Sequence, residues 1–96
     1  MDTGTSLRVL IAPDSFGDTL TAVAAAQAIA NGWSAARPDD VIVRAPQSDG
    51  GPGFVDVLAS RFGDVREETV SGPLGASVRA HWLLDDRTDP PTAYIE

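Results

Sequence analysis

Two aspartates stand in the loops that follow the first two apolar runs of the chain. Asp14 comes after Leu7–Ala12 (LRVLIA), and Asp49 comes after Val41–Ala45 (VIVRA). A carboxylate in such a loop can accept a proton from a substrate hydroxyl, hydrogen-bond a polyol, or hold Mg²⁺ directly or through water. It can equally stabilise its own turn through side-chain to backbone hydrogen bonds. The sequence leaves both roles open for both aspartates.

A glycine-rich stretch, DGGPG at residues 49–53, directly precedes a predicted helix. Glycine permits positive φ and close approach of the backbone to a ligand, and Pro52 suits the first turn of a helix, where its missing N–H is not needed. The N–H groups of that helix start, with the positive end of the helix dipole, favour an anion such as carboxylate or phosphate. A tight strand-to-helix turn without a ligand is the alternative.

Hydrophobic patterning indicates which elements position these loops. Leu7–Ala12 is predicted to be a buried strand and Val41–Ala45 a second strand, with an alanine-rich helix over about Leu20–Ala36 between them. The two strands are expected to be parallel neighbours in one sheet. Because ligands bind beyond the carboxyl ends of such strands, Asp14 and Asp49 should face one edge of the sheet, within reach of a common ligand.

The first predicted helix has an apolar side and a candidate cap at its start. Thr19 or Thr21 is expected to be the N-cap, and Gly32 indicates close packing or an early end. The residues expected to fall largely on one side are Leu20, Val23, Ile29, Ala30 and Trp33.

The second half of the chain predicts one more helix and then short antiparallel strands. The helix is indicated by Phe54, Val55, Leu58 and Phe62, with Gly63 as a left-handed C-terminal cap. The strands are expected over Val65–Ser71, Ala76–Leu84 and Thr92–Glu96. The fold class is therefore α/β, a β-α-β-α segment with parallel strands followed by antiparallel ones.

Charged residues of these strands carry less functional weight. Val78, Ala80, Trp82 and Leu84 should share one face, with Arg79 and His81 on the other. His81, the only histidine, is interpreted as solvated or structurally bonded, because no metal-ligand set accompanies it. Arg44 is interpreted as a surface residue, although it could aim at an anion. The pairs at 67–68 (Glu-Glu) and 85–86 (Asp-Asp) are interpreted as solvated charge.

Composition limits the class of protein and its partners. The 96 residues have a formal net charge of −7, which disfavours nucleic acid and anionic membrane as partners. No cysteine, secretion signal or transmembrane run is present, so a cytoplasmic location is expected. Residues 1–6 are expected to be a flexible N-terminus. The last predicted strand has nothing after it, which indicates an edge strand or an incomplete segment of a longer domain. Oligomeric state stays open.

Four blocks occur in an order that resembles the N-terminal portion of the bacterial two-domain glycerate kinases. They are APDSF at 12–16, P-x-x-D-G-G-x-G at 46–53, VSGPLGASVRA at 70–80 and AYIE at 93–96. The resemblance spans nearly all of the chain and about the first quarter of such an enzyme.

The resemblance implies two α/β domains with an active site in the cleft between them, where ATP and Mg²⁺ serve to phosphorylate D-glycerate. It implies that Asp14 or Asp49 accepts the substrate proton or organises Mg²⁺. Ser15, Gly50, Gly51, Gly53 and Glu96 are the residues it implies for substrate binding. The implied partners are glycerate, ATP and the remainder of the protein's own chain.

Three positions depart from the family pattern. Gly17 stands where the family usually has a lysine, and Pro52 and Phe54 stand where it usually has glutamate and threonine. Phosphoryl transfer needs groups that neutralise charge on phosphate oxygens. The alternative function is therefore a sugar-acid or anion-binding module, or an inactive kinase homologue. The 96-residue chain by itself is expected to be inactive.

Overall fold

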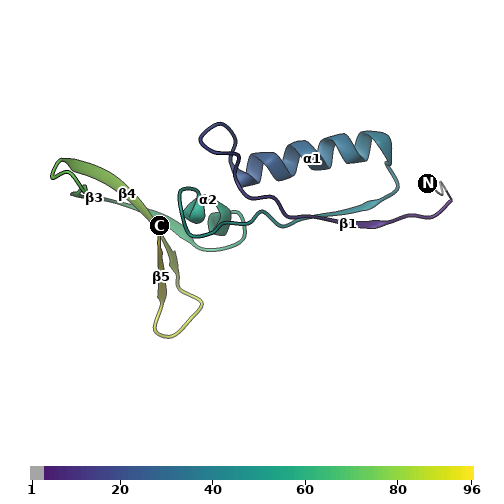
Figure 1. Ribbon diagram of the computed structural model, residues 1–96. Coiled ribbons are helices and arrows are strands. Elements are labelled where there is room, and N and C mark those ends of the chain that lie inside the picture. The colour runs from purple at the N-terminus through teal and green to yellow at the C-terminus, as the bar shows by residue number, and fades with distance from the viewer. Residues whose placement is uncertain (1–3) are drawn as a thin grey trace. The chain divides into compact units, whose positions relative to one another are not determined.

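The computed structural model describes residues 4–96, which form two compact units, one ending at Asp49 and one running from Gly50 to Glu96. The first contains β1 (Arg8–Ile11), α1 (Ala22–Ala36) and β2 (Val41–Arg44). The second contains α2 (Phe54–Ala59), β3 (Asp64–Ser71), β4 (Ser77–Asp85) and β5 (Thr92–Ile95) (Figure 1). The predicted α/β order is confirmed. Part of the expected flexible N-terminus, residues 1–3, lies outside the described residues.

The first unit is a parallel two-stranded sheet with one helix beside it. β1 and β2 pair from Arg8↔Val41 to Ile11↔Arg44, which confirms the predicted parallel arrangement. α1 runs along both strands (Figure 1). The core between helix and sheet is small, and it consists of Ile11, Ala26 and Ala30 with Val9 and Ile42 packed against them.

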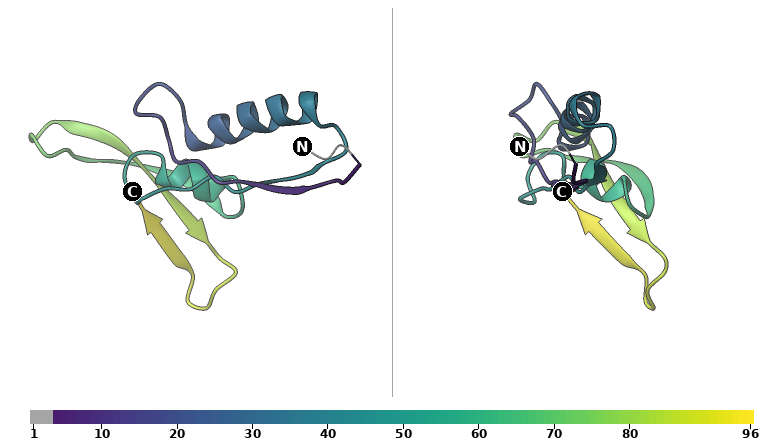
Figure 2. Two further views of the ribbon diagram at one scale, coloured as in Figure 1. Left: turned by 45° about the vertical axis from the view of Figure 1, so that its right-hand side comes forward. Right: turned by 90° about the vertical axis from the view of Figure 1, so that its right-hand side faces the viewer.

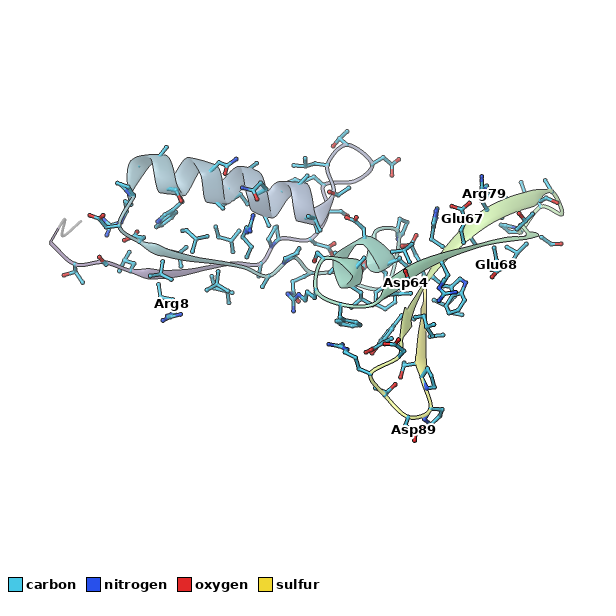
Figure 3. The ribbon with its side chains drawn as sticks, turned by 180° about the vertical axis from the view of Figure 1, so that it is seen from behind. Arg8, Asp64, Glu67, Glu68, Arg79 and Asp89 are labelled. Carbon is cyan, nitrogen blue, oxygen red and sulfur yellow. The ribbon has the colours of Figure 1, made fainter. Side chains whose placement is uncertain are left out.

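The prediction that the first strand is buried is wrong for most of its residues. Ile11 is buried, but Leu10 is 67% exposed. The side chains of a strand alternate between two faces, and α1 covers only one of them. Arg8, on the same side as Leu10, points away from α1 (Figure 3).

The alanines of α1, rather than its large apolar residues, face the sheet. The helix begins after Thr21, whose side chain accepts a hydrogen bond from the Ala24 N–H at 3.1 Å, so one of the two proposed caps is confirmed. Leu20 lies outside the helix, in a bridge with Phe16. Small side chains let the helix approach the strands closely, whereas Ile29 is 43% exposed. The buried positions are Ala22, Ala25, Ala26 and Ala30.

Gly32 neither ends α1 nor marks close packing. The helix continues to Ala36, and a Cβ added at Gly32 would have no heavy atom within 4 Å. Both sequence expectations for this glycine are therefore wrong.

Asp40 ties together three segments of the first unit. Its carboxylate accepts hydrogen bonds from the Leu7 N–H at 2.9 Å, from Trp33 Nε1 at 2.8 Å and from Arg37 Nε at 2.5 Å. The side chain of Asp40 is 1% exposed. The Arg37 guanidinium, more than any other neighbour, holds the pKa of the Asp40 carboxyl well below its ordinary value, against the opposing effect of desolvation. The buried carboxylate of Asp40 thus joins the start of β1, the end of α1 and the start of β2.

The second unit is a three-stranded antiparallel sheet in the order β3-β4-β5, with α2 packed on β3 and β4. β3 and β4 form a long hairpin, and β5 pairs only with the end of β4, from Trp82↔Ile95 to Asp85↔Thr92 (Figure 2). The predicted antiparallel strands are confirmed, and β5 is an edge strand among the described residues. In residues 4–96 neither helix has the length and apolar character needed to cross a membrane.

The second unit corrects the expected end of its helix, and burial shows which face of β4 is covered. α2 ends at Ala59 rather than at Phe62, and Gly63, with φ of 84°, comes after three further residues. A Cβ at Gly63 would lie 2.8 Å from the Leu83 side chain, so this turn presses against the core. Leu83 is fully buried, on the β4 face opposite the one formed by Val78 and Trp82. The most buried side of β4 is therefore the side that also carries Arg79 and His81.

Asp85 is a buried, paired carboxylate, so its interpretation as solvated charge is wrong. Its residue exposure is 3%, and its Oδ1 accepts from both the N–H and Nε of Arg87, at 3.0 and 2.8 Å. These hydrogen bonds hold the pKa of the Asp85 carboxyl below its ordinary value. The Arg87 guanidinium lies 4.4 Å above the centre of the Phe62 ring, which packs edge-on against Tyr94.

Substituting Asp40→Asn should destabilise the first unit at neutral pH, and the loss of stability should shrink as the pH falls below 3.8. The folded pKa of Asp40 is lowered, so its contribution is fully present above its ordinary value of 3.8 and is lost as the pH falls below that value toward the folded pKa. Urea unfolding of wild type and variant at pH 7 and pH 2 measures this difference. The matched control is Asp39→Asn, at an exposed neighbouring carboxylate. An equal loss of stability at both pH values would contradict the assignment.

The same substitution at two glycines of the first unit should have opposite effects. Gly32→Ala should raise the free energy of unfolding by about 0.5–1 kcal/mol, because alanine is the better helix former. Gly17→Ala should lower it by about 1–2 kcal/mol, because an L-residue is strained in the left-handed region. Neither added Cβ meets an atom within 4 Å, and the φ of Gly17 is 56°, so backbone conformation alone separates the pair. Denaturant unfolding reports both, and a stabilising Gly17→Ala would refute this account.

Candidate functional site

In the first unit, the pairing of β1 and β2 continues beyond the ends of the strands. The Ala45 N–H donates to the Ile11 carbonyl at 2.8 Å, and the Gln47 N–H donates to the Pro13 carbonyl at 2.9 Å. The loops that follow the two strands therefore leave the same edge of the sheet side by side. Asp14 and Asp49 each follow one of two adjacent parallel strands, and their reach to a common ligand stays a prediction.

Asp14 begins a tight loop that leads to α1. Its Oδ1 accepts the Ser15 N–H at 2.7 Å, and the loop is closed by the Phe16 N–H donating to the Leu20 carbonyl at 2.9 Å. The side-chain to backbone role foreseen as the structural alternative is thus present at Asp14. An ionised carboxylate has about four lone-pair sites, so this bond does not exhaust its capacity for a proton or a cation. Asp14 is exposed.

In the second unit, the glycine-rich stretch forms the entry to α2. Gly50 has φ of 97° and Gly53 has φ of 100°, a region that side-chain-bearing residues avoid. Gly53 is the N-cap and Phe54 the first helical residue, so Pro52 precedes the cap instead of occupying the first turn. This corrects the expected place of the proline. The helix therefore begins at Phe54, two residues later than a proline at its first position would place it.

The helix start is occupied by an acidic side chain of the same unit. Oε1 of Glu96 accepts the Gly53 N–H at 3.1 Å and the Val55 N–H at 3.2 Å. The predicted preference of this helix start for a carboxylate is therefore met by the protein itself. A cavity of about 330 Å³ adjoins this corner, lined by Gly53, Glu96 and His81 together with residues of α2 and Val65.

Other charged side chains are held by neighbours in their own unit. Arg44 is exposed and its Nη1 donates to the Gln27 side chain of α1. On the β3–β4 hairpin, Glu67 pairs with Arg79 (Figure 3). Glu67 also pairs with His81, whose Nε2 lies 2.8 Å from Glu67 Oε2. The structurally bonded interpretation of His81 is confirmed, and Glu67, which is exposed as expected, also pairs with these two basic side chains.

Comparison with known sequences places the chain in a family. The sequence profile described as "Glycerate kinase family" matches residues 9–96. The chain belongs to the glycerate kinase family. It corresponds to the N-terminal portion of the members, as the order of its motifs predicts.

Individual relatives agree with this glycerate kinase assignment. The chain is 41% identical over 91 residues to glycerate 2-kinase of Escherichia coli K12, and 40% identical over 91 residues to glycerate kinase of Bacillus subtilis 168. Each match covers 94% of this chain and 23% of the relative. An uncharacterized protein of Mycobacterium tuberculosis is 55% identical over 91 residues, covering 95% of this chain and 23% of that protein. The chain thus spans about a quarter of the length of these relatives.

A solved structure shows the same arrangement of elements. The crystal structure described as "putative glycerate kinase 2" from Salmonella typhimurium LT2 matches with a TM-score of 0.69 and 34% identity. The match covers 81% of this chain and 21% of that one. The α/β order of two parallel strands followed by three antiparallel strands therefore belongs to a glycerate kinase structure.

The three positions that depart from the glycerate kinase pattern have structural surroundings of their own. Gly17 sits in an open loop, with no heavy atom within 4 Å of the place where a Cβ would lie. Pro52 is exposed. The ring of Phe54 lies 6.4 Å from the ring of Tyr94, so this residue packs against β5. Phe54 thus makes an apolar contact at the position where the resemblance implies a hydroxyl.

Proposed function

We propose that this segment serves a glycerate kinase, in which a hydroxyl of glycerate is phosphorylated at the expense of ATP. The family match over residues 9–96 carries the proposal. Glycerate kinase activity belongs by name to relatives about four times as long, of which the chain covers 23%. We therefore expect the 96-residue chain alone to be inactive, and activity to require a protein of full family length, acting in the cytoplasm.

The candidate catalytic residues are Asp14 and Asp49, at the ends of adjacent parallel strands. One of them accepts the proton of the substrate hydroxyl as its oxygen attacks the γ-phosphorus of ATP and ADP departs. A correctly placed base of this kind contributes roughly 10²–10⁴-fold to a rate. Ser15 and the backbone of Gly50 and Gly51 serve as substrate-binding groups.

Mg²⁺ bound with ATP would supply positive charge to the phosphate oxygens. The carboxylates of Asp14 and Asp49 are the oxygen donors that this cation prefers. Among residues 4–96, no group of three or more His, Asp or Glu side chains is gathered as a metal cage. This fits magnesium, which is commonly held by one or two carboxylates and completes its shell with phosphate and water.

A second function is favoured by the surroundings of Gly17 and Phe54. The open loop at Gly17 offers no cation in place of the family's lysine, and Phe54 packs against Tyr94. A protein with these features retains an acid-binding pocket without transfer chemistry. Calorimetry separates the two functions: glycerate binding without ADP release by the full-length protein would favour the binding module.

Asp49→Asn, made in an enzyme of full family length that carries this segment, should lower kcat by roughly a hundredfold or more with little change in thermal stability. A coupled assay of ADP release measures this, and Asp14→Asn tested beside it identifies which carboxylate is the base. Asp39→Asn is the control, because Asp39 is an exposed aspartate at the amino-terminal end of β2. Wild-type turnover in both Asp14→Asn and Asp49→Asn would eliminate the assignment.

A further inference from the structure

The start of α2 is held by a residue far away in sequence. Gly53, the N-cap, has no side chain to accept a hydrogen bond. Glu96 supplies the acceptor from 43 residues away, through Oε1 to the N–H groups of Gly53 and Val55 at 3.1 and 3.2 Å. In most helices a serine, threonine, asparagine or aspartate at the cap itself performs this task. The glycine cap of this helix therefore depends on a tertiary contact.

Packing does not hold Gly53 in place. Its φ of 100° is open to glycine alone, and no heavy atom lies within 4 Å of the position a Cβ would take. Glycine also has the largest conformational freedom to lose. The two hydrogen bonds from Glu96 are consequently a restraint on this residue that side-chain contacts do not duplicate.

From this geometry we propose that Glu96 is a positioning residue, which fixes the backbone of the loop Gly50–Gly53 for phosphoryl transfer without touching the substrate. The catalytic consequence rests on the proposed glycerate kinase function. The restraint itself is a property of the second unit and is measurable without any substrate.

Charge at this corner argues against direct binding of glycerate by Glu96. The carboxylate of Glu96 meets the helix start, and Asp56 adds a second acidic side chain in the first turn of α2. Like charges repel, so the carboxylate of glycerate or a phosphate of ATP is disfavoured there. The N–H groups expected to receive the substrate anion already donate to the protein's own carboxylate.

Amide hydrogen exchange tests the restraint in the 96-residue chain. Glu96→Ala removes the acceptor, and exchange at the Val55 and Gly53 amides should accelerate roughly tenfold, as expected for loss of hydrogen bonds to a charged group. Glu96→Gln keeps an acceptor oxygen at the same reach, so exchange should stay within about threefold of wild type. Amides of the β3–β4 ladder report whether the fold survives. Unchanged exchange at Val55 in a folded Glu96→Ala chain would overturn the proposal.

Steady-state kinetics test the consequence in an enzyme of full family length that carries this segment. Glu96→Ala should lower kcat roughly tenfold or more, because small displacements of a positioned group are costly, while KM for glycerate stays within about twofold. Glu96→Gln should restore most of kcat. Glu68→Ala is the matched control, since Glu68 is an exposed glutamate on β3 (Figure 3). A Gln variant as defective as Ala, or a rise in KM alone, would show that Glu96 acts by charge or by binding substrate.

The two experiments separate failure of the restraint from failure of the proposed function. If the wild-type enzyme does not phosphorylate glycerate, the proposed function fails, and the exchange rates still decide whether Glu96 fixes the loop. If turnover is present and Glu96→Ala leaves both kcat and exchange unchanged, the positioning role fails and the proposed function stands.

Discussion

The parallel pairing of β1 and β2 is the constraint on which the candidate residues of the first unit depend. Neighbouring parallel strands bring their carboxyl ends to one edge, and here the pairing extends past both strands, through Ala45 to Ile11 and Gln47 to Pro13. The loop that contains Asp14 and the loop that ends at Asp49 must therefore leave the sheet at the same edge. The buried carboxylate of Asp40 supports this pairing from the other end, because it joins the start of β1 to the turn that precedes β2.

In the second unit, the feature that needs support is the end of the glycine-rich loop, where α2 begins. The glycine cap of this short helix has no side chain to accept a hydrogen bond and none to pack against a neighbour. The edge strand β5 supplies the missing group at Glu96, and Tyr94 of the same strand packs against Phe54 at the start of the helix. One strand thus provides both the polar and the apolar contacts of the helix entry.

The positions that depart from the family pattern differ in how much they contribute to packing. Phe54 contributes to packing, so restoring a threonine there would remove a ring contact. Gly17 has open space around it, although its φ of 56° makes any side chain at that position strained. A lysine at Gly17 would therefore add a cation without disturbing any packing contact. A threonine at Phe54 would add a hydroxyl only by removing the ring contact with Tyr94.

The sequence by itself determined the order of elements, the parallel and antiparallel pairings and the family, because these follow from local periodicity, turn residues and motif order. It narrowed the cap of α1 to Thr19 or Thr21, and the structure selected Thr21. It also placed Asp14 and Asp49 after adjacent strands. Only the tertiary structure decided which face of α1 is buried, that Asp40 and Asp85 are buried and paired, and that Glu96 caps α2. These features depend on partners brought together from distant positions, such as Asp40 with Leu7 and Glu96 with Gly53, separated by 33 and 43 residues. Such pairs leave no periodic signal, because the partner of a buried polar group is chosen by folding and not by spacing.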